Sequence, residues 1–315
     1  VGQTIGNATV AYVGSGTSFT LSSLTDATTN NFKIYSYNGS GSSTSYLTPS
    51  PLTGSTTTLA PSALTASAAT NIYSNSFTAN WNGTASCANS YSLTVNAVEG
   101  FENSLSLFTA SGTGGQFLTG INSSGSPSTA PFASAGTYGY GVVNGTGILT
   151  SIPINTIGMN APRLSFNLSA LSYAITGNGI DAGDSIRVDI SPDNGLTWFS
   201  TLSVNGSTAN SFWSFGVPTT ASAAYDGDNT IAGFSGNGTG SGLGTVVITA
   251  LPSVAQLRVR ITLKNNDIRL AWVVDDFRLS NTIGGVTGTS YNVTNTIAGA
   301  LYNYTINSVG TGTTT

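Results

Sequence analysis

The sequence contains no histidine, a single cysteine (Cys87), a single methionine (Met159) and only 6% charged residues. Without histidine, the Ser–His–Asp and Cys–His arrangements of nucleophilic enzymes are excluded, and general acid–base chemistry would fall to carboxylates or lysine. One cysteine forms no internal disulfide. Since soluble domains usually carry about 25% charged side chains, the polar surface here must consist of Ser, Thr, Asn and Gly. We therefore expect a protein without enzymatic activity.

Enough apolar material is present for a folded core, because 39% of the residues are hydrophobic and 10% are aromatic. Disordered chains instead combine high charge with few aromatics. The length of 315 residues predicts two or three domains. The net charge of −4 argues against nucleic acid as a partner. The lack of any run of about 18 apolar residues argues against insertion into a membrane.

The two ends of the sequence carry one pattern twice, 272 residues apart. The first copy is Thr17–Leu24 followed by Asn31–Asn38, and the second is Thr289–Ile297 followed by Asn303–Gly310. Apolar residues alternate with polar ones in every block, which is typical of half-buried strands. The matched apolar positions are Phe19 with Tyr291, Leu21 with Val293, Phe32 with Tyr304, and Ile34 with Ile306. We interpret the chain as one repeat plus an overlap.

These blocks resemble the C-terminal half of a fibronectin type III domain. Tyr302 stands where that family has its corner tyrosine, whereas the first copy departs from the family with Asn30 at the matching position. The N-terminal half of such a domain is found once. Its first three strands would be Ala60–Ser67, Ser76–Asn82 with Trp81 as the core tryptophan, and Tyr91–Val95.

The resemblance implies a division of the chain into three parts. Residues 1–58 would be the C-terminal half of a preceding fibronectin III-like domain. Residues 59–97 plus 285–315 would form a split fibronectin III-like domain, and residues 98–284 an inserted domain. Insertions are tolerated where the two ends of the host loop lie close together on the surface.

The inserted segment is predicted to be all-β as well. Arg163–Leu168, Ser185–Ile190 and Gln256–Leu263 all alternate apolar with polar residues. Asn194-Gly195 predicts a hairpin, since this dipeptide supplies the positive φ angles of a tight turn. Many short strands separated by turns predict a two-sheet sandwich.

Three marks of this segment resemble the MAM-like and carbohydrate-binding-module-like jelly rolls of secreted Bacteroidota proteins. They are the opening Phe101-Glu102, the hairpin segment Gly183–Trp198 and the closing strand Trp272–Leu279. The resemblance implies an inserted jelly-roll β-sandwich, an extracellular or cell-surface location, and a structural Ca²⁺ near the opening glutamate and the closing aspartates. Such folds carry many functions, so the fold alone assigns none.

The positions that match the implied calcium site are Glu102, Asp275 and Asp276, with Glu99 as a further ligand. Calcium binds six to eight oxygen ligands. Consecutive aspartates on a strand point to opposite faces, and an inward aspartate needs a cation or strong hydrogen-bond donors. The alternative is that one aspartate accepts backbone N–H bonds and the other is solvated.

Aromatic side chains raise the question of sugar binding. Tyr138, Tyr140, Trp213 and Phe215 flank Gly- and Ser-rich segments, and planar rings on a sandwich can stack on the faces of sugars. The alternative is that they pack in the core or are exposed singly, which needs no functional explanation.

The sequence therefore predicts a non-enzymatic structural or adhesive repeat unit of a long extracellular fibre or adhesin. Its partners would be neighbouring repeats or identical subunits, and also surface glycans. The alternative is the carbohydrate-binding module region of a large secreted enzyme. The strands missing from residues 1–58 would come from a neighbouring subunit if the chain is whole, or from preceding residues if it is part of a longer chain.

Overall fold

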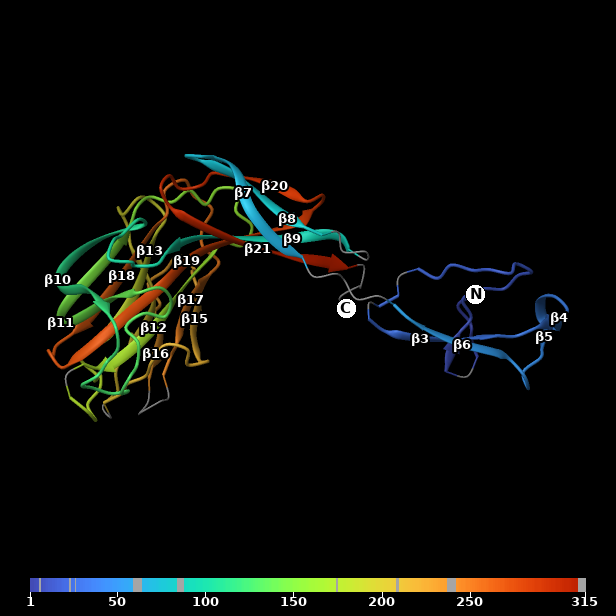
Figure 1. Cartoon of the computed structure of the whole chain (residues 1–315), viewed down its shortest axis with the longest axis horizontal. Helices are drawn as coiled ribbons and strands as arrows, with labels where there is room; N and C mark the ends of the chain where they lie inside the picture. Colours follow the sequence, from blue (N-terminus) through green and yellow to red (C-terminus); the bar gives the residue numbers. More distant parts are fainter. Residues whose placement is uncertain are drawn as a thin grey trace.

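The computed structural model describes residues 1–5, 7–22, 24–25, 27–58, 64–83, 88–173, 175–207, 210–236 and 242–310. Over these ranges the chain forms 21 strands and one short 3₁₀ turn (Figure 1). The predicted all-β fold is therefore confirmed. No helix in the part described here is long and apolar enough to cross a membrane. Cys87 lies outside the described residues.

The strands of residues 1–58 pair only with one another in the described structure. They form three two-stranded ribbons: β1 (Thr4–Ile5) with β2 (Ala8–Thr9), β3 (Thr29–Ile34) with β6 (Leu52–Thr57), and β4 (Tyr37–Asn38) with β5 (Ser45–Tyr46), the last pair joined through η1 (Gly41–Ser43). The strand expected over residues 17–24 is not formed in the described part of that range. Phe19 instead stacks on Tyr12, with ring centroids 5.0 Å apart. Alternation predicted a strand there, but among the described residues no strand lies beside it to pair with it.

A small sandwich is built from both flanks of the inserted segment. One sheet has the order β20–β8–β7. The facing sheet contains β9 between β21 and the C-terminal part of β19. The bounds are β7 (Thr65–Tyr73), β8 (Ser76–Asn82), β9 (Ala88–Glu99), β19 (Leu270–Val286), β20 (Ser290–Thr294) and β21 (Leu301–Gly310). Trp81 lies in its core with Phe77, Leu93 and Val293, so this tryptophan is buried as expected.

A large sandwich is formed by the residues between β9 and the end of β19. Its strands hydrogen-bond in the order β15–β17–β12–β19–β11–β18–β13–β14–β16, with β10 on the outer side of β11. All pairs are antiparallel except β14 with β16 and β15 with β17. The bounds are β10 (Phe108–Thr119), β11 (Tyr138–Ser151), β12 (Arg163–Ser172), β13 (Ser185–Ser191), β14 (Phe199–Asn205), β15 (Thr220–Ala224), β16 (Ala232–Ser235), β17 (Thr245–Thr249) and β18 (Arg258–Asn265).

The large sheet folds back on itself at β11. The segment 140–142 of this strand pairs with β19, whereas the segment 145–150 pairs with β18. The change of partner falls at Asn144, which has a φ of +50°, opposite a register shift in β10 at Gly114, with a φ of +83°. A Cβ at Gly114 would lie 2.8 Å from the Val143 carbonyl oxygen. Glycine is therefore required where the two strands bend together.

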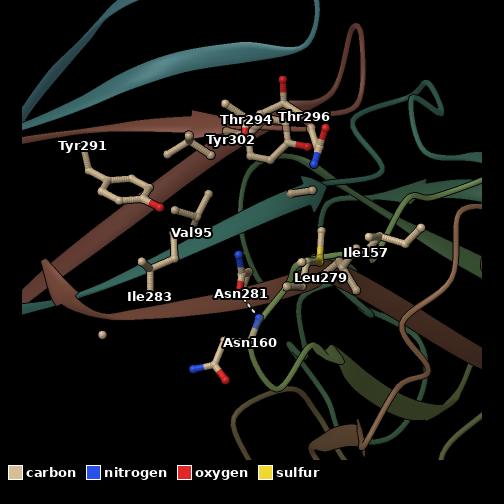
Figure 2. A pocket seen from close by; sticks show the side chains of 16 residues that line it. Val95, Ile157, Asn160, Leu279, Asn281, Ile283, Tyr291, Thr294, Thr296 and Tyr302 are labelled. Atoms are coloured by element: carbon tan, nitrogen blue, oxygen red, sulfur yellow. Dashed lines mark hydrogen bonds between the residues drawn. The ribbon is translucent and has the colours of Figure 1, made fainter.

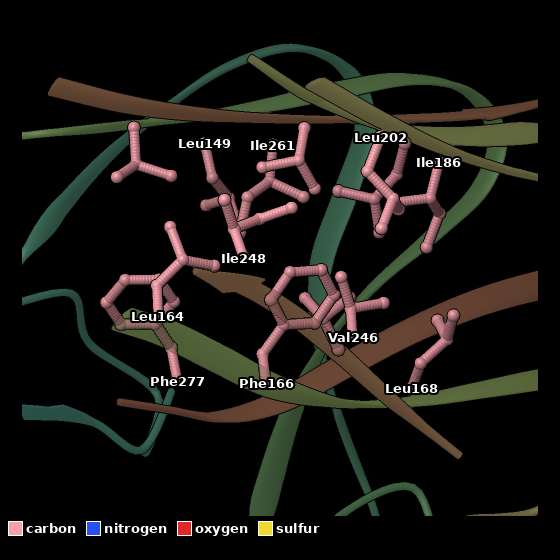
Figure 3. Close-up of a cluster of buried hydrophobic side chains, with 14 of the residues drawn as sticks. Leu149, Leu164, Phe166, Leu168, Ile186, Leu202, Val246, Ile248, Ile261 and Phe277 are labelled. Carbon is pink, nitrogen blue, oxygen red and sulfur yellow. The ribbon is translucent and has the colours of Figure 1, made fainter. Parts of the chain in front are cut away.

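The core of the large sandwich lies between the two layers that this bend creates. Figure 3 shows side chains of β12 and β17 pointing toward side chains of β11, β13, β14 and β18. Alternate residues are buried, such as Leu164, Phe166 and Leu168 on β12, which are at most 1% exposed. This period of two is the one the sequence predicted. Complete burial of each such side chain contributes about 1.5–3 kcal/mol.

Phe166→Ala tests this core. We expect a loss of about 3–5 kcal/mol in the free energy of unfolding, because the substitution removes apolar contacts and leaves a cavity. Leu196→Ala is the control, since Leu196 is 85% exposed and its loss should cost no more than about 0.5 kcal/mol. Urea unfolding of both variants measures the difference, and similar losses would contradict the layer arrangement.

Candidate functional site at the junction of the two sandwiches

Two long strands are shared by the small and the large sandwich. Residues 278–280 of β19 pair on one side with β12 and on the other with β9. Farther along, β19 leaves β12 and continues beside β9 alone, to Val286 opposite Tyr91. β21 lies on the other edge of β9. One hydrogen-bonded sheet therefore runs through the junction, as the course of β9 and β19 in Figure 1 shows.

A buried polar network ties three strands together at this junction. Asn96 of β9 is 7% exposed. Its Oδ1 accepts a hydrogen bond from the Ser280 hydroxyl at 2.6 Å, and its Nδ2 donates to Asn303 Oδ1 at 2.7 Å. Buried polar groups need such partners, because an unsatisfied one loses its hydration without compensation. The network therefore specifies the register of β19, β9 and β21.

Tyr302 of β21 packs against both hydrophobic cores. Its hydroxyl accepts a hydrogen bond from the backbone N–H of Ile297 at 2.8 Å. A tyrosine hydroxyl bonded to backbone a few residues upstream is the contact of a tyrosine corner. Burial raises the pKa of Tyr302 above its ordinary value of 10.0. This side chain thus fixes the β20–β21 connection over the junction.

A cavity of about 390 Å³ opens beside Tyr302. It lies between the junction strands, the segment 157–160 and the segment 291–296 (Figure 2). The Asn160 N–H donates to Asn281 Oδ1 at 2.9 Å and closes one side. Tyr291, which is 36% exposed, lies at the opposite side. None of the described residues that line this cavity carries a charge.

The lining defines what the cavity can do chemically. Amide, hydroxyl and tyrosine groups can hydrogen-bond a neutral polar molecule, and a tyrosine ring can stack on an apolar face of it. The volume falls within the range of about 300–1,000 Å³ that is common for small-molecule sites. The lining is therefore suited to binding a molecule of this kind.

The carboxylates predicted to bind calcium all accept hydrogen bonds or pair with a guanidinium. Glu99 is 3% exposed, and its Oε2 accepts the backbone N–H groups of Ser106 at 2.6 Å and Leu107 at 2.8 Å. Glu102 is exposed, and both its oxygens accept the N–H of Thr137, at 3.0 and 3.1 Å. Their side chains brace the loops on either side of β10.

The two consecutive aspartates differ sharply in environment. Asp275 is fully buried, and its Oδ2 accepts the N–H groups of Ser134 at 2.7 Å and Ala135 at 3.0 Å. Asp276 has a φ of +51° at a bulge in the pairing of β19 with β12. Its carboxylate pairs with the Arg278 guanidinium at 2.7 Å. The bulge, rather than regular alternation, sets the directions of the two side chains.

Each of the four carboxylates faces an N–H group or a guanidinium. A carboxylate oxygen that accepts one such bond keeps a lone pair for a cation, so the implied calcium site stays a prediction. In the residues placed by the structure, no three His, Cys, Asp or Glu side chains gather as metal ligands. The contacts of Asp275 match the alternative in which one aspartate accepts backbone N–H bonds, and Asp276 pairs with an arginine rather than with water alone.

The aromatic residues expected to bind glycans do not line the junction cavity. Trp213 is fully buried, with its ring edge-on to Trp272 and its Nε1 donating to the Leu243 carbonyl at 3.1 Å. Tyr140 is 3% exposed and packs edge-on against Phe117. The expectation that these two rings stack on sugars is corrected, because both fill the core.

The other two predicted glycan-binding residues are half-buried. Tyr138 lies at the start of β11, opposite Thr119 of β10. Phe215 packs against a separate apolar cluster of the large sandwich. The sequence reasoning did not identify Tyr291 and Asn160 as lining residues of a cavity. For Tyr291 the available signal was its position just after the inserted segment, where two folding units must meet, whereas Asn160 lies well inside that segment and offered no such signal.

Comparisons with solved structures include a distant likeness in fold. No family model matches the chain, and no curated protein matches it. A solved structure of the K2 cleaved adhesin domain of Lys-gingipain (Kgp) aligns with a TM-score of 0.33 and 15% sequence identity, over 58% of this chain and 97% of that chain. A likeness at this level assigns neither fold family nor function to the chain.

Asp275→Asn tests the electrostatics of the buried carboxyl. Burial raises the pKa of Asp275 above its ordinary value of 3.8, so the folded state binds its proton more tightly than the unfolded state does. The stability that this group contributes is complete below pH 3.8 and is lost as the pH rises toward the raised pKa. Asparagine does not titrate. We therefore expect the free energy of unfolding of the native protein to exceed that of the variant by an amount that shrinks with rising pH in that window.

Urea unfolding of both proteins at a series of pH values measures this difference in the free energy of unfolding. Other titrating groups are common to the two proteins and cancel in the difference. If the difference grows with pH instead, the hydrogen bonds from the N–H groups of Ser134 and Ala135 outweigh desolvation in setting the pKa of Asp275. That result would contradict the expected direction.

Proposed function

We propose that this chain is a non-enzymatic structural or adhesive repeat unit of a long extracellular surface fibre or adhesin. The observation that carries the proposal is the sheet shared by the two sandwiches. Domains joined by a peptide linker reorient freely unless their interface is large. Here β9 and β19 cross the junction as paired strands, and the buried Asn96 network and Tyr302 reinforce it. A unit of this kind keeps its shape under load.

The proposal includes the division of the chain into a split fibronectin III-like domain (residues 59–97 plus 285–315) and an inserted jelly roll (residues 98–284). The order β20–β8–β7 facing β19–β9–β21 supports the first part, as does the Tyr302 hydrogen bond to Ile297. The folding back of the large sheet at β11 supports the second. Residues 1–58 would then belong to the preceding domain of the array.

The lack of histidine and the state of the carboxylates support a role without catalysis. Glu99 and Asp275 are buried and bonded to backbone N–H groups, so neither is free to act as an acid or base on a substrate. The thiol-poor, weakly charged composition is compatible with secretion and with a cell-surface location.

Stiffness of the junction tests the structural role. Spin labels at Ile72 and Leu196, which are 72% and 85% exposed on the small and the large sandwich, are introduced in a Cys87→Ser background. We expect a narrow distribution of distances between the labels by pulsed electron paramagnetic resonance. Tyr302→Ala should broaden it, because that side chain packs against both cores. Tyr291→Ala is the control and should leave it narrow. A broad distribution in the unsubstituted chain would count against a stiff unit.

A second candidate function is carbohydrate binding, as in a module of a large secreted enzyme. The uncharged cavity beside Tyr302 favours it, since its amide, hydroxyl and aromatic groups suit a neutral sugar.

A glycan array probed with residues 1–315 tests this function. We expect reproducible binding of a neutral glycan, and Tyr291→Ala should reduce that binding at least tenfold. Leu196→Ala should bind as the native chain does, because Leu196 does not line the cavity and is strongly exposed. Absence of binding would reject the carbohydrate-binding function and leave the structural role as the proposed one.

A further inference from the structure

Four of the eight basic residues of the chain lie on one face of the large sandwich. β13 and β18 are paired neighbours, and every second residue of each packs in the core. The positions in between are therefore turned to the outer side of the sheet. The basic residues at these outer positions are Arg187 on β13 and Arg258, Arg260 and Lys264 on β18. We call this surface the basic face.

Few carboxylates oppose these cations. Asp189 is the one acidic residue of β13 and β18. In the turns at the ends of these strands, Asp184 accepts backbone N–H groups, and Asp193 accepts hydrogen bonds from its own turn. Asp267 pairs with Arg269. The basic face thus carries a local excess of positive charge on a chain whose net charge is −4.

Three arginines of the basic face are anchored through their Nε atoms. Asp189 is fully buried, and its carboxylate is paired with Arg187 Nε at 3.0 Å and with Arg260 Nε at 2.9 Å. Arg258 Nε donates to Asn194 Oδ1 at 2.7 Å. A guanidinium carries five N–H donors in a fixed planar fork. An anchor at Nε therefore leaves terminal Nη groups for other partners.

Most of these terminal groups are free to bind a ligand. No described residue hydrogen-bonds to the Nη atoms of Arg187 or Arg260, and Arg258 uses only one of its Nη atoms, for a backbone carbonyl. The Arg260 guanidinium also lies over the Trp198 ring, 4.2 Å from its centroid, which fixes its plane. Because these side chains are already ordered, a ligand that binds them causes a smaller loss of side-chain entropy.

The basic face is suited to a linear ligand. Alternate residues of a strand are about 6.8 Å apart, so Arg258 and Lys264 are separated by roughly 20 Å along β18. Thr262 lies between Arg260 and Lys264, and Thr150 of β11 is opposite Arg260. Positive charges are therefore interspersed with hydroxyl groups. A chain molecule with spaced negative charges, and with hydroxyl groups between them, matches this surface.

A carboxylate is the anion that this surface already accommodates, since Asp189 lies between Arg187 and Arg260 with one oxygen on each. Arginine binds carboxylates through pairs of parallel N–H groups. A protein partner fits less well, because the centre of a protein interface is depleted in charged residues. Nucleic acid is disfavoured by the net charge of −4. A carboxylated polysaccharide satisfies both the charge and the hydroxyl groups.

We propose that the basic face binds an acidic linear polysaccharide, whose uronic-acid carboxylates accept hydrogen bonds from the terminal nitrogens of the three arginines. Lys264, which is exposed, supplies a further positive charge at one end. This inference goes beyond the proposed structural role, because no residue of the basic face lines the junction cavity. The ligand also differs in charge from the neutral sugar that suits that cavity.

Titration calorimetry of the whole chain with polygalacturonate, a linear polymer of a uronic acid, tests the proposal. We expect saturable binding at about 0.05 M salt, where charges on the surface are weakly screened. The methyl ester of the same polymer is the matched ligand control. It should not bind, because esterification removes the negative charges and leaves the ring hydroxyls in place.

Arg187→Gln combined with Lys264→Gln is the test variant. The Arg187 side chain is 44% exposed, and the buried Asp189 keeps Arg260 as its partner, so we expect thermal unfolding close to that of the native chain. The affinity for polygalacturonate should fall about tenfold or more, since two of the four cations are lost.

Lys33→Gln combined with Arg163→Gln is the control, with the same change of net charge on β3 and β12 instead of the basic face. Its affinity should change by less than about twofold. Absence of binding to polygalacturonate, equal binding of the methyl ester, or an equal loss in the two double variants would each overturn the proposal. So would duplex DNA or polyglutamate that binds as tightly as polygalacturonate, because the face would then accept any polyanion.

The proposed function is tested by other parts of the molecule. The label distances report on the junction, and the neutral-glycan array reports on the cavity beside Tyr302. A chain that fails to bind polygalacturonate but gives a narrow label distribution would therefore reject only the acidic-polysaccharide site, and the proposed structural role would stand.

Discussion

The pairing of β9 with the C-terminal half of β19 is the constraint on which the rest of the structure depends. β19 is held by β12 on one side and by β9 on the other over the same three residues. Without this pairing the facing sheet of the small sandwich would keep only β9 and β21. A two-stranded ribbon is marginally stable alone. The small sandwich is thus stabilised by strands that the large sandwich also orders.

Neutral polar groups, rather than charges, carry much of the specificity of this fold. The junction uses two asparagines and a serine where many proteins use an ion pair. Among the salt bridges of the described residues, only Asp189 has a fully buried carboxylate. Its two partners, Arg187 and Arg260, stay partly exposed. Amide and hydroxyl contacts are not screened by salt as surface ion pairs are. A protein held together in this way keeps its contacts across a wide range of ionic strength.

Local alternation predicted most of the strands, because it depends on residues that are adjacent in sequence. Ser76–Asn82 is both the predicted strand and the observed β8. Alternation does not say which strand lies next to which, so it also predicted a strand at residues 17–24, where the described part of the chain offers no partner strand. The Asn194-Gly195 turn was predictable for the same local reason, and its φ angles are +63° and +90°.

The site was harder to predict, since its features depend on contacts distant in sequence. Glu99 and Asp275 resemble metal ligands by type and spacing, but the backbone N–H groups that bind them come from loops that carry no recognisable signal. Trp213 flanks a Gly-rich stretch that resembles an open loop. In the structure, Gly236 packs directly on its ring, where a Cβ would lie 2.3 Å from the indole. Glycine there is a sign of close packing rather than of an exposed aromatic surface.

The repeat shows most directly that one sequence pattern can have two structural outcomes. Within the described residues, Ile34 and Ile306 occupy matching positions on matching strands, and only Ile306 packs in the cluster that contains Leu93. Burial of the Ile306 face contributes free energy in proportion to the apolar area removed from water. Because β21 pairs with β9, and β9 pairs with β19, this contribution is joined through one sheet to the large sandwich.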